Sequence, residues 1–397
     1  MPSRSKMLII CLVSMTQFMA ETMIRQIIPL QARSLGAAPD LIGLIVSSYS
    51  FFPLLIAIPS GEIIDRVGFR AMIATSCIGM AAASAILVLF PTIPGLVISQ
   101  MVAGVMTVIV ILAAQAYVAR ISDASNRTLY FSVYSLVMAG GFLVGPPLGG
   151  IIADLSGYIM TFAIAGILSV LASLLVILLP PAADQETDSG VSSPTAGGMA
   201  EMLHQGRRLL RRRDVQMALY ISILGLFGLS MRNSFYPLYL DQIGYSTSRI
   251  GVLIALQSAV SLLVRPFMTT LLRGGFLLPT SLAMMVGAIG IGLTPYFTGF
   301  APLAAVSILY GLTTAVSQPV SMILMASGSD LEHQGLAMGL RQTANQAAML
   351  ASPVFLGLLA ARLSIGHSFL FTAILWTGGS ITLLLIRKAS RRMSSVS

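Results

Sequence analysis

The apolar residues of this chain fall into long runs, and nearly all charged residues lie in the short segments between them. About 20 consecutive apolar residues cross a bilayer as a helix. Twelve such spans are predicted, at about 7–31, 41–63, 71–90, 95–119, 127–153, 158–179, 215–240, 248–272, 277–297, 301–327, 335–362 and 366–386. Each span is expected to be a helix, because backbone groups in lipid must be hydrogen-bonded within their own segment. The predicted fold class is therefore an all-α membrane protein.

The scarcity of charge supports this class. Only 9% of the 397 residues are charged and 56% are hydrophobic, whereas a soluble domain carries about 25% charged residues. The spans leave no room for a soluble domain. Gln17, Glu21 and Arg25 interrupt the first apolar run, so it is expected to be a retained span and not a signal peptide.

The lysines and arginines are distributed unevenly between the two sides of the predicted membrane. Most of the 23 lie on the side of the N-terminus, whereas Arg33, Arg249 and Arg362 lie in loops on the other side. Cytoplasmic segments are enriched in Lys and Arg, so both termini are expected in the cytoplasm and the chain in the cell membrane. This bias accounts for the net charge of +9 without nucleic acid. The expected partners are the lipid bilayer and a small solute, and the expected state is a monomer.

One long connection divides the chain. We expect a six-helix bundle at 1–179, a cytoplasmic linker at 180–213, a second six-helix bundle at 214–386 and a cytoplasmic tail at 387–397. The linker begins as a Pro/Gly/Ser-rich segment. It ends in a short basic amphipathic helix at the inner membrane surface, or equally in a plain basic flank of the next span.

The two halves resemble each other in sequence. Residues 27–43 are similar to 235–251, and residues 142–162 are similar to 349–369, with nearly the same shift. Two parallel repeats of six spans are the plan of one class of transporters.

Few charged residues lie well inside the spans, away from their ends. They are the acid Glu21 and the cations Arg25, Arg232, Arg265 and Arg341. A charge at mid-bilayer costs about 2.5–3.5 kcal/mol on insertion scales, so each is a functional candidate. The excess of guanidinium groups favours a solute with an anionic or carboxylate group.

These charges and the polar residues at helical spacing from them form the candidate substrate site. The predicted substrate-binding residues are Gln17, Glu21, Arg25, Arg232, Asn233, Gln318, Arg341 and Asn345. Glu21 is the candidate for taking up and releasing a coupling proton. The alternative is that Glu21 and Arg25, one helical turn apart, only neutralise each other during insertion.

The turn between the second and third spans is charged and rich in glycine. Its pattern consists of Gly61, Asp65, Arg66, Gly68 and Arg70. It resembles the loop between spans 2 and 3 of the major facilitator superfamily of transporters. The resemblance implies a latch between the cytoplasmic ends of the two bundles, with Asp65 near the start of span 11, where the helix dipole favours negative charge. An ordinary solvated loop is the alternative.

The fifth span carries a second pattern of small residues and proline. It consists of Gly141, Gly145, Pro146, Gly149 and Gly150. It resembles the fifth-span motif of the drug and metabolite:proton antiporters of the same superfamily, which implies proton-coupled export. The alternative is that these glycines only allow another helix to pack closely against the fifth span. In the fourth span the family motif has an arginine four residues before a glycine, but here Gln100 precedes Gly104.

The sequence therefore predicts a secondary transporter that works by alternating access. Proton-coupled export of a small organic solute carrying an anionic group is the leading hypothesis. An uptake symporter or facilitator for an organic anion is the alternative, and a non-transporting receptor or scaffold is the second. Cys11, Cys77 and the three histidines lack the spacing of metal ligands, so no metal, cofactor or enzymatic activity is expected.

Overall fold

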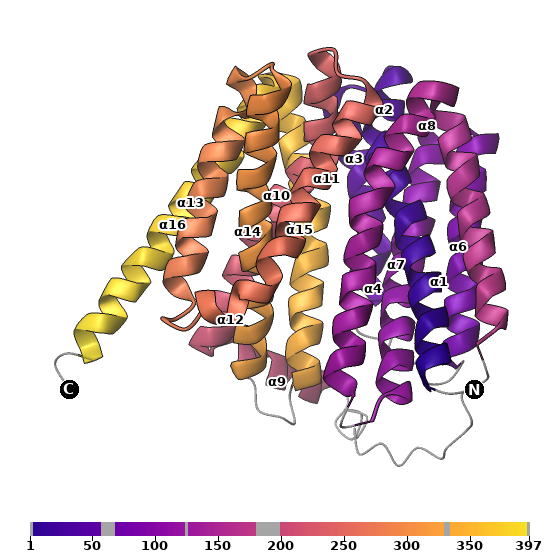
Figure 1. Ribbon diagram of the computed structural model, residues 1–397. Helices are drawn as coiled ribbons and strands as arrows, with labels where there is room; N and C mark the ends of the chain where they lie inside the picture. Colours follow the sequence, from indigo (N-terminus) through magenta and orange to yellow (C-terminus); the bar gives the residue numbers. More distant parts are fainter. Residues whose placement is uncertain (1–2, 57–67, 124–125, 180–198, 329–333, 395–397) are drawn as a thin grey trace.

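The computed structural model describes residues 3–56, 68–123, 126–179, 199–328 and 334–394. Within these residues every regular element is a helix, and the helices form two bundles side by side, one from each half of the chain (Figure 1). The first bundle contains α1 (Ser3–Arg25), α2 (Ile27–Ser34), α3 (Pro39–Ser47), η1 (Ser48–Ser50), α4 (Phe51–Ile56), α6 (Phe69–Leu89), α7 (Ile93–Ile121) and α8 (Arg127–Ile177). The second half contains α9 (Met199–Leu210), α10 (Arg213–Gln242), α11 (Thr247–Val264), η3 (Arg265–Phe267), α12 (Met268–Leu271), α13 (Leu277–Leu293), η4 (Thr294–Tyr296), α14 (Phe300–Ser327), α15 (Gln334–Arg362) and α16 (Ile365–Ser394). The predicted all-helical fold class is confirmed.

The described residues include 11 helical segments that are long and apolar enough to cross a membrane. One of them lies in α8, which has 51 residues and, at 1.5 Å per residue, is about 77 Å long, more than twice the thickness of a hydrocarbon core. Gly157 breaks this helix with φ of 81° and ψ of 171°, a conformation that glycine adopts readily. α8 therefore provides two crossings, which correspond to the predicted fifth and sixth spans.

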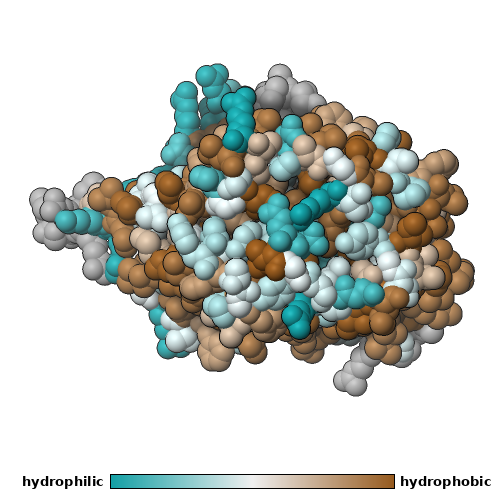
Figure 2. Space-filling model, turned by 90° about the horizontal axis from the view of Figure 1, so that it is seen from above, coloured by the Kyte–Doolittle hydropathy of each residue, from teal (hydrophilic) through white to brown (hydrophobic). Residues whose placement is uncertain are grey.

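Large apolar side chains are exposed on the outside of the bundles, among them Leu155, Ile374 and Leu385. Seen from the end opposite the termini, polar residues gather across the middle of the face and apolar residues form most of its rim (Figure 2). So much exposed apolar surface is unusual for a soluble monomer, and lipid tails would cover it.

Two prolines explain the breaks in the first two spans. Pro29 has no N–H to donate to the Arg25 carbonyl, and α1 ends at Arg25. Pro53 likewise leaves the Tyr49 carbonyl without its helical partner, and the chain forms the 3₁₀ turn η1 there. That carbonyl lies against Gly104 of α7, where any Cβ atom would collide with it. The break fixes Tyr49 in position.

The two halves meet backbone to backbone at four glycines. They are equivalent in pairs in the sequence repeat, Gly43 with Gly251 and Gly150 with Gly357. A Cβ atom on any of them would collide with backbone atoms of the other half, as at Gly43 with the Pro353 carbonyl. Through these contacts α3 packs against α15, and α8 packs against α11. Equivalent glycines of the internal repeat therefore form close contacts between the two halves.

Two sets of polar contacts between the halves lie at the same end, opposite the termini (Figure 1). Arg33 Nη1 is 2.8 Å from Asp241 Oδ2, and these two positions are also repeat-equivalent. Asp154 at the bend of α8 accepts hydrogen bonds from the N–H groups of Thr247 and Ser248, each at 2.8 Å. A carboxylate at this helix start is favoured by the exposed N–H groups and the dipole.

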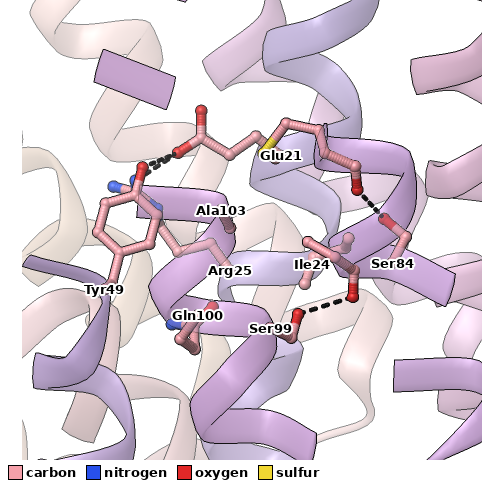
Figure 3. A pocket seen from close by; sticks show the side chains of 10 residues that line it. Glu21, Ile24, Arg25, Tyr49, Ser84, Ser99, Gln100 and Ala103 are labelled. Atoms are coloured by element: carbon pink, nitrogen blue, oxygen red, sulfur yellow. Dashed lines mark hydrogen bonds and ion pairs between the residues drawn. The ribbon is translucent and has the colours of Figure 1, made fainter. Parts of the chain in front are cut away.

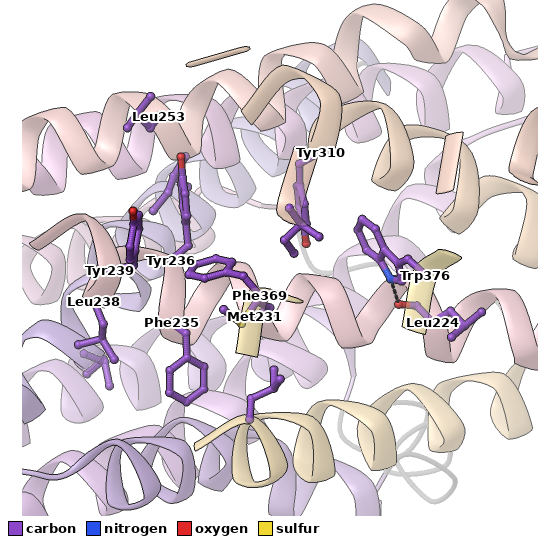
Figure 4. Close-up of a cluster of buried hydrophobic side chains, with 14 of the residues drawn as sticks. Leu224, Met231, Phe235, Tyr236, Leu238, Tyr239, Leu253, Tyr310, Phe369 and Trp376 are labelled. Carbon is purple, nitrogen blue, oxygen red and sulfur yellow. Dashed lines mark hydrogen bonds between the residues drawn. The ribbon is translucent and has the colours of Figure 1, made fainter. Parts of the chain in front are cut away.

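The second bundle has an aromatic core that holds α10 (Figure 4). Trp376 is fully buried, and its Nε1 donates to the Leu224 carbonyl at 2.7 Å. Its ring stacks on Tyr310 with centroids 5.4 Å apart. Gly228 and Gly287 make room for the indole, because a Cβ atom at either would collide with it. This packing fixes the helix that carries Arg232.

The predicted basic helix of the linker forms as α9 and packs against α10 and α15. Leu209 is buried in the core of the second half, whereas Leu210 is 41% exposed. The side chains of Arg207 and Arg208 are exposed.

Candidate functional site

A cavity of about 230 Å³ lies between the two halves. From the first half it is lined by Phe18, Glu21, Thr22, Arg25, Gln26, Tyr49, Thr107, Val108, Ile111, Phe142 and Pro146. From the second half it is lined by Leu229, Arg232, Asn233, Ile254, Gln342, Gln346 and Met349. Two guanidinium groups and one carboxylate therefore face a mostly apolar space.

Glu21, Arg25 and Tyr49 form one hydrogen-bonded group in the wall of this cavity. Glu21 and Arg25 lie one turn apart on α1 and form an ion pair. The Tyr49 hydroxyl donates to Glu21 Oε1 at 2.7 Å, and Arg25 Cζ lies 4.6 Å from the centroid of the Tyr49 ring. The side chain of Glu21 is only 5% exposed, so its charge is balanced within the protein.

The same three residues also line a small side pocket of about 10 Å³ (Figure 3). Ser84, Ser99 and Gln100 contribute to its wall. This volume is enough for about one water molecule. Gln100 stands at the position where the related fourth-span motif has arginine. In this chain the guanidinium group that lines the same pocket belongs to Arg25.

Arg232 approaches the cavity from α10. Its Nη2 donates to the Ile254 carbonyl and to Ser258 Oγ, both at 3.1 Å. Its Nε is buried without a hydrogen-bond partner. In the part of the chain that the structure describes, the ion pairs are Arg25–Glu21 and Arg33–Asp241, so no described carboxylate neutralises Arg232.

The other predicted substrate-binding residues lie outside the cavity lining. Gln17 is buried in α1 with its Oε1 unpaired, and Asn345 Oδ1 accepts a hydrogen bond from Ser222 Oγ at 2.6 Å, which joins α10 to α15. Gln318 lies beside Gly225, and Arg341 is partly buried. The expected excess of four cations over one acid is therefore reduced at the cavity to Arg25 and Arg232 against Glu21.

Several residues that line the cavity were not predicted from the sequence. Gln342 and Gln346 face the cavity in place of their neighbours Arg341 and Asn345. One residue along a helix changes the direction of a side chain by about 100°, and spacing alone does not fix that rotation. The lining positions of Tyr49 and Phe18 likewise depend on tertiary packing.

The glycines of the fifth span form a seam with α1. Cβ atoms on Gly141, Gly145 and Gly149 would collide with atoms of α1, whereas Gly150 faces the start of α11. At this seam Thr22 Oγ1 donates to the Gly141 carbonyl at 3.1 Å.

Pro146, the next residue of the fifth-span pattern, also accepts a hydrogen bond from the first span. Gln26 Nε2 donates a hydrogen bond to the Pro146 carbonyl. The pattern therefore holds the helix that carries Glu21 and Arg25.

The proposed latch lies mostly outside the described residues, since Gly61, Asp65 and Arg66 fall between 57 and 67. Gly68 has φ of 89° and precedes α6, where glycine is favoured. Arg70 Nη2 donates to the Ile177 carbonyl at 2.8 Å and so ties the start of α6 to the end of α8.

Comparison with known proteins assigns the chain to a family. The model of the Major Facilitator Superfamily matches residues 10–301. The chain is 23% identical over 368 residues to the uncharacterized MFS-type transporter MJ1560 of Methanocaldococcus jannaschii, covering 92% of this chain and 94% of that protein. It is 26% identical over 244 residues to the quinolone resistance protein NorA of Staphylococcus aureus, covering 60% of this chain and 59% of NorA.

The fold matches solved transporters. The crystal structure of the nucleoside transporter NupG superposes with a TM-score of 0.80 at 14% identity, covering 96% of this chain and 99% of NupG. A bacterial homolog of the human lysosomal transporter Spinster gives a TM-score of 0.79 at 12% identity, covering 96% of each chain. The chain therefore belongs to the major facilitator superfamily and is a multi-pass membrane transporter, not an enzyme.

Proposed function

We propose that this transporter exports a small organic solute with an anionic group, in exchange for protons, by alternating access of the cavity between its halves. The observation that carries the proposal is Arg232, a cavity cation whose charge no described carboxylate balances. An uncompensated guanidinium in a low-dielectric cavity favours an anion.

Glu21 is the proposed coupling group. It is the one carboxylate among the residues that line the cavity. Protonation of Glu21 would dissolve its ion pair and release Arg25, so that the charge of the cavity changes by one.

Export is supported by the fifth-span glycine pattern and by the similarity to NorA over 60% of the chain. The NorA name describes resistance to quinolones, and its transfer to this chain is part of the proposal. The strong Lys and Arg bias toward the end that holds both termini supports termini in the cytoplasm of a cell-membrane protein. We expect a monomer.

One observation favours the second candidate, proton–anion cotransport. Glu21 already uses Arg25, so an anion that bound to Arg25 would displace the carboxylate and promote its protonation. Anion and proton would then bind together, which is the requirement for a symporter.

Proton flux in inverted membrane vesicles separates the two candidates. Vesicles with an acidic lumen are supplied with radiolabelled aliphatic and aromatic monocarboxylates, and vesicles that lack the protein are the control. Export predicts that one of these acids accumulates inside while the lumen becomes more alkaline. If the acidic lumen instead drives preloaded acid out, the protein is a symporter and the export proposal is wrong.

A further inference from the structure

We infer that the solute is a small monocarboxylate with an apolar ring, whose acid group binds Arg232 and whose ring lies against Phe18 and Phe142. The inference rests on the proposed function, because it names the substrate class for the same cavity.

Arg232 is arranged to bind an acid. The two hydrogen bonds of its Nη2, to the Ile254 carbonyl and to Ser258 Oγ, hold the guanidinium in place. Its buried Nε has no partner. Hydrogen bonds from a guanidinium to a carboxylate are charge-assisted and about twice as strong as neutral ones, and a carboxylate would accept from guanidinium N–H groups other than the two that Nη2 already uses.

Amide side chains line the same cavity as Arg232. Asn233 follows Arg232 on α10, and Gln342 and Gln346 line the cavity from α15. Amide N–H groups donate to carboxylate oxygens without adding charge. The second half of the protein therefore supplies both the cation and the neutral donors that a carboxylate requires.

A cationic solute has no comparable site. The carboxylate of Glu21 is shared by Arg25 and by the Tyr49 hydroxyl. A cation would have to displace Arg25 while Arg232 repelled it. A dicarboxylate would need a second free cation, which the ion pair of Arg25 does not provide.

The first half supplies an apolar wall. The rings of Phe18 and Phe142 lie 5.6 Å apart at an interplanar angle of 30°, and Val108 and Ile111 extend the surface. Aromatic rings bind such a surface by stacking and by burial of apolar area. A heavily hydroxylated solute would leave its hydroxyl groups without partners there.

The size of the cavity limits the solute. Its volume of about 230 Å³ lies below the roughly 300–1,000 Å³ of pockets for drug-sized ligands. One ring with a short acid chain suits this space better than a polycyclic drug. Because the acid and the ring would contact different halves, such a solute would also bridge them.

Isothermal titration calorimetry on the purified full-length protein in nanodiscs tests this inference with four probes. Phenylacetate has the ring and the acid, acetate lacks the ring, 2-phenylethylamine carries a cation, and 2-phenylethanol has no charge. We expect phenylacetate to bind at least about tenfold more tightly than each of the others. Binding of acetate or 2-phenylethylamine as tight as that of phenylacetate would overturn the inference.

Variants assign the two parts of the site. Arg232→Ala should weaken phenylacetate at least about tenfold and leave 2-phenylethanol unchanged, which also shows that the variant is folded. Phe142→Leu should weaken phenylacetate and 2-phenylethanol together, and Arg362→Ala, an exposed arginine outside the cavity, should change neither. Unchanged phenylacetate binding in both cavity variants would contradict the assignment.

Binding and transport can fail separately. Tight phenylacetate binding without proton-linked flux in vesicles would leave the ligand class standing and remove the proposed export. Proton-linked, Arg232-dependent flux of an acid without a ring would leave export standing and overturn the ring requirement.

Discussion

At the residue scale, the site is an arrangement of unequal charges. Glu21 has two partners, Arg25 and Tyr49, whereas Arg232 is held by a carbonyl and a hydroxyl that carry no charge. The first half therefore contains the proposed coupling group, Glu21, and the second half contains Arg232, the proposed binding group for the solute.

Glu21→Gln tests the coupling role. Glutamine has nearly the same shape but cannot ionise, so we expect proton-linked accumulation to fall to the level of vesicles without the protein. Exchange of labelled for unlabelled solute should continue, because it needs no net proton movement. Both are measured in the same vesicles.

Asp123→Asn is the matched control, since Asp123 is exposed and lies away from the cavity lining. Proton-linked accumulation at the wild-type rate in Glu21→Gln would remove Glu21 from the coupling step.

Part of this site could be predicted from the sequence. Glu21, Arg25 and Arg232 stand out because charges inside apolar spans are costly, and these three residues line the cavity. Tyr49 could not be predicted, because its position depends on the break at Pro53 and on the fit of its carbonyl against Gly104. On α15 the sequence predicted Arg341 and Asn345, whereas their neighbours Gln342 and Gln346 line the cavity. Packing sets the rotation of the helix, and spacing alone does not fix it.

At the element scale, the span count and helix type follow from length and hydropathy, but the contacts of the glycines require the structure. The sequence repeat predicts two similar halves. It does not predict that the halves contact each other at Gly43, Gly150, Gly251 and Gly357. The fifth-span glycines, in turn, hold α1 by direct packing, which is the role that the alternative of close helix packing describes.

Gly251→Ala tests the packing between the halves. A Cβ atom there would collide with the Pro146 carbonyl and with Pro147 Cα, which are backbone atoms with little freedom to move. Overpacking of this kind costs about 1–3 kcal/mol, so we expect a lower thermal unfolding temperature and slower transport.

Gly378→Ala is the control, because this helical glycine has open space around the added methyl group. It should leave stability unchanged or raise it by up to about 1 kcal/mol through helix propensity. Equal stability of both variants would contradict the close contact at Gly251.

At the scale of the whole molecule, two bundles meet at the end opposite the termini and enclose a cavity between them (Figure 1). Alternating access requires these contacts to open during the cycle. The pair Arg33–Asp241 is 39% and 38% exposed, and such pairs contribute about 0.2–1 kcal/mol, which suits a contact that must break repeatedly.

Charge reversal tests this closure. Arg33→Asp or Asp241→Arg alone places like charges side by side, and we expect transport to slow by up to about fivefold. The double variant restores an opposite pair and should recover most of the wild-type rate. A double variant as slow as the single variants would show that the pair does not act in closure.

The central claim is that the cavity between the halves opens to each side of the membrane in turn. Asn233→Cys places a thiol in the cavity wall, while the native Cys11 and Cys77 are buried. Its rate of labelling by a membrane-impermeant maleimide is measured in right-side-out and in inverted vesicles. Labelling from both sides is the predicted result, and labelling from one side only, or from neither, would contradict the account.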